Sequence, residues 1–240
     1  MKPKKLKTLS AAIFCAALLT SSAYSQVKPD VKTEAMLAET RAKSDADQEK
    51  KAAEWVTSLS LNDASKAARI QAIIATHLKT VRDWHNDHPF STVPAGINPV
   101  TGIKLSELDR QVIANSAMPN TVHENLMSGL RKDLTEQQVE AILDKYTIGK
   151  VAFTMNGYKS IVPNLTAVEE AEILKNLKQA REQAIDYKNM NQISAIFEIY
   201  KTKSEQYLNS NGRSWKQMYK DYTNMIKAKK AADAAAAKKQ

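Results

Sequence analysis

The histidines are the residues whose spacing most clearly suggests chemistry. His77, His85 and His88 fall on one face of a predicted helix at 100° per residue, and His123 stands on a later predicted helix beside Glu124. Two helices of this kind can bring imidazole nitrogens and a carboxylate around a Zn²⁺-like ion. This pattern makes His85, His88 and His123 weak candidates for metal ligands.

A structural role for these histidines is the better interpretation of the same spacing. The segment from His85 to His88 straddles the end of a predicted helix, where imidazoles satisfy terminal carbonyls and suit the helix dipole. The chain also contains no standard zinc signature. We therefore expect no metal ion and no other cofactor.

An irregular segment follows these histidines and is a candidate ligand-binding loop. Residues 89–102 hold three prolines and two glycines, which predicts a long, shaped loop on a helical scaffold. Aromatic faces beside arginines and carboxylates suit a sugar or a uronate, through stacking and paired hydrogen bonds. The candidate ligand-binding residues are Arg82, Trp84, His85, His88, Asn98, Asp109, Arg110, His123 and Arg131. The alternative, which we favour, is that the loop only caps the open end of a helical bundle.

The first 25 residues predict export. Four lysines precede a short apolar run, and Ala23 and Ser25 provide the small residues of a cleavage site before Gln26. Cys15, the only cysteine, would be removed with this signal peptide, which excludes disulfides from the mature chain. We expect a periplasmic protein, with the extracellular space as the alternative. No transmembrane segment is expected after cleavage.

The basic charge of the chain does not indicate a nucleic-acid partner. Of the formal net charge of +9, four positive charges belong to the predicted signal peptide, which leaves 9 − 4 = +5. Most of the remainder lies in an Ala/Lys tail at 227–240, whereas a nucleic-acid footprint needs basic residues clustered on a folded face. The expected partner is instead an oligosaccharide or a periplasmic protein.

The rest of the chain predicts a mainly α, single helical-bundle-like domain of about six to eight helices at 54–226. Residues 26–53 have little to bury and predict a linker or a loosely held helix. Two capping boxes, at Thr135–Gln138 and Thr166–Glu169, mark helix starts. One small β-hairpin is predicted at about 150–162, because β-prone runs flank Asn156-Gly157.

Three stretches resemble an uncharacterised family, a domain of unknown function found in exported proteins of polysaccharide-degrading Gram-negative bacteria. They are residues 93–99 with 105–110, residues 146–162 and residues 180–187. The resemblance covers about residues 55–222. It implies a periplasmic accessory to the breakdown of glycans such as pectin-like polymers, but no established catalytic residues.

Three functions remain open from the sequence. The first is an exported accessory protein that binds a glycan fragment or a protein partner in polysaccharide utilisation. The second is a periplasmic chaperone-like helical protein, suggested by the Leu-Thr-x-x-Gln stretch at Leu134–Gln138. The third is an enzyme acting on acidic sugars through His85, His88 or His123, and we favour a non-enzymatic role over it.

Overall fold

The computed structural model describes residues 31–99 and 101–237, and the side chains from Glu34 onward within them. The predicted signal peptide at 1–25 lies outside these residues. The chain divides into two units, residues 1–41 and residues 42–240. The described part of the first unit is the start of a helix, and its side chains from Glu34 to Arg41 are exposed.

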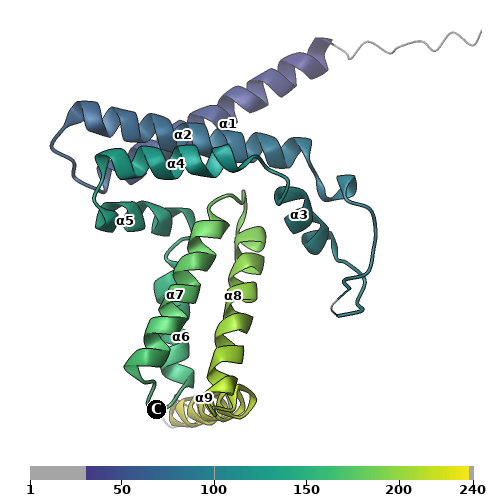
Figure 1. Ribbon diagram of the computed structural model, residues 1–240, viewed down its shortest axis with the longest axis vertical. Coiled ribbons are helices and arrows are strands. Elements are labelled where there is room, and N and C mark those ends of the chain that lie inside the picture. Colours follow the sequence, from purple (N-terminus) through teal and green to yellow (C-terminus); the bar gives the residue numbers. More distant parts are fainter. Residues whose placement is uncertain (1–30, 100, 238–240) are drawn as a thin grey trace, which may run out of the picture. The chain divides into compact units, whose positions relative to one another are not determined.

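Nine α-helices and one short 3₁₀ helix are found within the described residues (Figure 1). They are α1 (Val31–Thr57), α2 (Ala64–Asp87), η1 (Phe90–Thr92), α3 (Glu107–Asn115), α4 (Asn120–Asp133), α5 (Glu136–Tyr146), α6 (Lys150–Ile161), α7 (Ala167–Ala184), α8 (Met190–Ser210) and α9 (Trp215–Ala237). The mainly α class predicted from the sequence is confirmed.

Side-chain caps account for where several helices begin. Asp63 caps α2 by accepting a hydrogen bond from the backbone N–H of Lys66 at 2.9 Å. The capping boxes predicted at Thr135 and Thr166 are both formed, and a third at Ser106 opens α3. Each cap satisfies donors that the first helical turn leaves without partners.

The core of residues 42–240 consists of two hydrophobic clusters. The first is formed by α1, α2, α4 and α5, where α2 and α4 lie side by side (Figure 1). The second is formed by α6, α7 and α8. The turn between α7 and α8 joins them, because Ile185 packs into the first cluster and Tyr187 into the second.

The predicted hairpin at 150–162 is wrong, since this segment forms helix α6. Val151, Met155, Tyr158 and Val162 are buried, and their spacing of three or four residues is the period of a helix, not of a strand. Packing of this stripe on α7 and α8 outweighs the local turn preference of Asn156-Gly157. Gly149, at φ +63°, supplies the left-handed residue that starts the helix.

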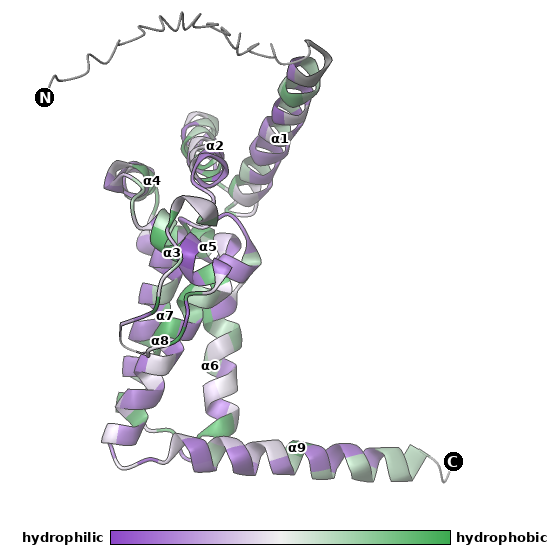
Figure 2. Ribbon diagram, turned by 90° about the vertical axis from the view of Figure 1, so that its right-hand side faces the viewer, coloured by the Kyte–Doolittle hydropathy of each residue, from purple (hydrophilic) through white to green (hydrophobic). Residues whose placement is uncertain are grey.

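Helix α9 has no buried residue, although Trp215 and Met218 pack partly against the second cluster. Hydrophilic and hydrophobic residues alternate along it (Figure 2). The helix continues through residues 227–237 of the predicted Ala/Lys tail. No helix within the described ranges is both long and apolar enough to span a membrane.

Candidate functional site: a cationic pocket beside a histidine–aspartate network

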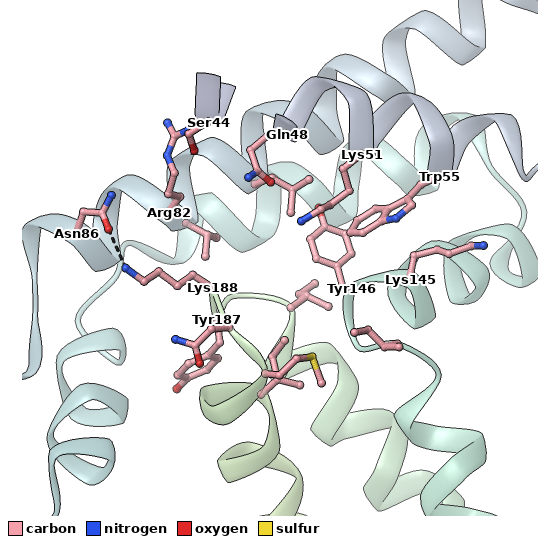
Figure 3. A pocket seen from close by; sticks show the side chains of 17 residues that line it. Ser44, Gln48, Lys51, Trp55, Arg82, Asn86, Lys145, Tyr146, Tyr187 and Lys188 are labelled. Atoms are coloured by element: carbon pink, nitrogen blue, oxygen red, sulfur yellow. Dashed lines mark hydrogen bonds between the residues drawn. The ribbon is translucent and has the colours of Figure 1, made fainter. Parts of the chain in front are cut away.

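A cavity of about 690 Å³ opens between α1, α2, the end of α5 and the turn before α8 (Figure 3). Four cationic side chains line it, and so do the rings of Trp55, Tyr146 and Tyr187. The cations are Lys51, Arg82, Lys145 and Lys188. Among the described residues, no acidic side chain lines it, so its walls are predominantly positive. We call it the cationic pocket.

The four cations differ in how they are neutralised. Arg82 is paired with Asp45 at 2.7 Å and with Asp83 at 2.8 Å. Lys188 donates a hydrogen bond to Oδ1 of Asn86 at 2.7 Å and forms no ion pair with any described residue (Figure 3). Lys51 and Lys145 make no ion pair within the part of the chain that the structure describes.

The aromatic rings give the pocket apolar faces. Trp55 packs edge-on against Tyr146, with ring centroids 4.7 Å apart. Tyr187 is buried on the opposite side, on the turn that precedes α8 (Figure 3). Ile148 also lines the cavity, and its φ of +52° is costly for a β-branched residue. The pocket therefore combines rings suited to stacking with ammonium groups suited to anions.

A chain of hydrogen bonds runs from this pocket into the protein. The hydroxyl of Tyr146 donates to Nδ1 of His77 at 3.1 Å, and Nε2 of His77 donates to Oδ1 of Asp186 at 3.0 Å. Oδ2 of Asp186 accepts a hydrogen bond from Nδ1 of His123 at 2.8 Å. One carboxylate therefore holds two imidazoles in defined tautomers.

The backbone carbonyl of Asp186 also accepts two hydrogen bonds, as its carboxylate does. It accepts hydrogen bonds from Nε2 of His85 and from Nδ2 of Asn115, both at 3.2 Å. Side chains from α2, α3 and α4 thus all bind one residue of the turn between α7 and α8. This set of contacts fixes the turn that carries Tyr187 and Lys188 into the cationic pocket.

The network shifts the pKa values of its members in opposite directions. The hydrogen bond to Asp186 is the main cause that raises the pKa of His123. Burial acts to raise the pKa of Asp186, but hydrogen bonds from His123 and His77 hold it below its usual value. Burial lowers the pKa of His85 and raises that of Tyr146 well above the usual range. At neutral pH the carboxylate is charged and the tyrosine is protonated.

The three predicted metal ligands make different contacts in the structure. His85 is 2% exposed and bound to the Asp186 carbonyl, whereas His123 binds the carboxylate of Asp186 from α4. His88 ends α2, stacks on Trp84 at 3.7 Å between ring centroids, and donates from Nδ1 to the Trp84 carbonyl. Within residues 31–99 and 101–237, no group of three histidine or carboxylate side chains is arranged to hold a metal ion.

The remaining predicted ligand-binding residues mostly hold local structure. Arg110 donates to the carbonyl of Val93 and lies over the ring of Phe90, which ties the loop to α3. Asp109 forms the capping box of α3, and Asn98 accepts from the backbone of Thr101. Arg131 lies 3.5 Å from Glu136 at the surface. Of the nine candidates, only Arg82 lines the cationic pocket.

Most of the chain matches a single protein family. Residues 45–228 match the family described as "Protein of unknown function (DUF3826)". The chain belongs to the DUF3826 family. The match contains every residue of the cationic pocket except Ser44, and the whole histidine–aspartate network. No curated protein matches this DUF3826 chain.

Sequence reasoning missed the residues that matter most in the geometry of this DUF3826 protein. Lys51 lies in a segment interpreted as a linker or a loosely held helix, and Lys145 and Tyr146 lie at a helix end that showed only packing. Asp186 and Tyr187 close the motif at residues 180–187, which was the one available signal. Contacts between residues far apart in the chain define both the pocket and the network.

Proposed function

We propose that this protein is an exported periplasmic accessory of polysaccharide utilisation that binds an acidic glycan fragment in the cationic pocket. One cavity supports this proposal most directly. In it, Lys51 and Lys145 lie beside three aromatic rings, and neither lysine has an ion-pair partner among the described residues. The role is binding, not catalysis.

A uronate-containing oligosaccharide suits each wall of the pocket. Its carboxylates gain charge-assisted hydrogen bonds from Lys51, Lys145 and Lys188, and its ring faces stack on Trp55. A cavity of about 690 Å³ accepts a fragment of a few sugar residues. The predicted signal peptide and the family resemblance support a periplasmic location.

The acidic-sugar enzyme is the weaker alternative, because its three histidines do not share one cavity. His85 is enclosed and His88 stacks on Trp84, which leaves His123 alone facing a cleft. The chaperone alternative rested on the Leu-Thr-x-x-Gln stretch, and here that stretch is a capping box. Neither alternative gives the cationic pocket a function, whereas glycan binding does.

Isothermal titration calorimetry with hexagalacturonate, and with an uncharged galactose oligosaccharide as the control ligand, tests this function. We expect saturable binding of the acidic ligand that depends on Lys51 and Lys145, whereas any binding of the uncharged ligand should not depend on them. Changing Lys51 and Lys145 to glutamine should weaken hexagalacturonate binding by about tenfold for each lysine, since tenfold corresponds to about 1.4 kcal/mol and a hydrogen bond to a charged group contributes about that much.

Lys216→Gln is the matched control, because Lys216 is an exposed lysine on α9, outside the pocket. It should leave the affinity unchanged. Absence of hexagalacturonate binding, or an affinity for it that survives loss of both pocket lysines, would contradict the proposal.

A further inference from the structure

We propose that the cleft around His123 is a second ligand site, which takes an uncharged, hydroxyl-rich ligand such as a neutral sugar residue. The cleft has a volume of about 570 Å³ and lies between α4, α7 and α8. It adjoins a smaller cavity of about 280 Å³, and both are lined by His123 and Asp186. The larger cleft shares no lining residue with the cationic pocket.

The side chains of the cleft favour a polar but uncharged ligand. Three amides, Asn120, Gln179 and Gln183, both donate and accept hydrogen bonds, as sugar hydroxyls also do. The ring of Tyr200 also lines the cleft, with the ammonium group of Lys203 over it.

The charges of the cleft do not favour an anion. Glu124, Glu182 and Asp186 carry three negative charges, against one on Lys203 and that of His123 when it is protonated. Lys203 is already engaged, because it donates to Oε1 of Gln179 at 3.4 Å and lies over the ring of Tyr200. The cleft is therefore electrostatically opposite to the cationic pocket.

His123 is positioned to be the recognition centre of this site. Its Nδ1 is taken by the carboxylate of Asp186, so Nε2 is the nitrogen left for a ligand. Oε1 of Glu182 lies 3.7 Å from Nε2, which is beyond hydrogen-bond length but close enough for an ion pair when His123 is protonated. A ligand hydroxyl placed beside both groups can bond to each of them.

The buried side of the network supports a role beyond joining helices. Asp186 is held from behind by His77, which is 4% exposed and itself fixed by Tyr146. Besides tying α2 and α4 to the turn after α7, this arrangement holds the imidazole of His123 in one orientation, as a preorganised binding group requires.

Nuclear magnetic resonance of the histidine side chains tests the site directly. The probes are xylohexaose, cellohexaose and galactotetraose, with His123→Asn used to assign the His123 signal. Asparagine keeps a donor toward Asp186, and Gln183→Ala is the second variant if His123→Asn does not fold. We expect at least one neutral probe to move the His123 signal saturably, and Gln183→Ala to weaken that probe by about tenfold.

The lysine variant of the cationic pocket separates this inference from the proposed function. Loss of Lys51 and Lys145 should leave binding of the neutral probe unchanged. Glu172→Gln is the control for Gln183→Ala, because Glu172 lies on α7 as Gln183 does but outside the cleft, and it should also leave this binding unchanged. A His123 signal that no neutral probe moves, or that only hexagalacturonate moves, would overturn the inference.

Discussion

Nε2 of His77 lies 3.0 Å from Oδ1 of Asp186, a contact between residues 109 positions apart in the sequence. The other carboxylate oxygen of Asp186 accepts from His123. Helices α2 and α4 and the turn after α7 therefore meet at a single carboxylate. This turn also carries side chains into the cationic pocket, so the stability of the network and the shape of the pocket are linked.

Replacing Asp186 by asparagine should lower the free energy of unfolding by about 2 kcal/mol, because two hydrogen bonds to a charged acceptor are weakened or lost. Urea unfolding at neutral pH measures the change. Asp87→Asn, at the exposed end of α2, is the matched control and should change stability by less than about 0.5 kcal/mol. Equal stability of the two variants would show that the network contributes nothing to the fold.

The raised pKa of His123 predicts how stability depends on pH. Its contribution is fully present below the unfolded pKa of about 6.5 and is lost as the pH rises through the folded pKa. The lowered pKa of Asp186 sets the acid limit, since that contribution is lost only as the pH falls through its folded pKa.

His85 has the opposite dependence, because its lowered pKa means that stability is lost as the pH falls below about 6.5. The contribution of His85 is the same in the protein and in His123→Asn, so it cancels when the two are compared. The difference in unfolding free energy between the two should be largest at mildly acidic pH and should shrink through neutral to alkaline pH. A difference that stays constant with pH would refute the assignment.

Two glycines provide a direct test of helix α6. A Cβ at Gly157 meets nothing within 4 Å, so Gly157→Ala should stabilise the protein by about 1 kcal/mol as alanine replaces glycine inside a helix. Gly149→Ala also has space, but its φ of +63° should make it destabilising by about 1 kcal/mol. Thermal unfolding of both variants checks the signs. A destabilising Gly157→Ala would instead favour a hairpin turn at this position.

The ion pair between Glu169 and Arg213 should make a second contribution to stability that is lost in acid. A hydrogen bond from Arg213 is the main cause that lowers the pKa of Glu169 to about 2, followed by the backbone of Thr166. This stabilisation is present above the unfolded pKa of about 4.5 and is lost as the pH falls toward about 2. Arg213→Gln should therefore lower the melting temperature by a few degrees at neutral pH and by progressively less in acid. Arg131→Gln, at a surface pair, should change it little at either pH.

The sequence predicted the helical class and several helix starts because capping and apolar spacing are local properties. Thr135 and Thr166 show their caps within four residues of sequence. The error at residues 150–162 has a related origin. Asn156-Gly157 is a strong local turn signal, and only packing of Val151, Met155 and Tyr158 against distant helices overrides it.

The candidate site was much less predictable than the helices. His123 was singled out for its residue type, but its partner Asp186 is 63 positions away and had no distinguishing spacing. Lys51 and Lys145 look like ordinary surface lysines until folding places them in one cavity with Trp55. A single sequence shows which residues could do chemistry, but not which of them meet.

The fluorescence of Trp55 is the most direct test of the cationic pocket. With Trp84 and Trp215 changed to phenylalanine, Trp55 is the only tryptophan and reports on a ligand in the cavity that it lines. We expect a saturable change with hexagalacturonate that weakens as salt screens the lysines and is lost when Lys51 and Lys145 become glutamine. A signal that hexagalacturonate leaves unchanged, or a response that persists without both lysines, would contradict this expectation.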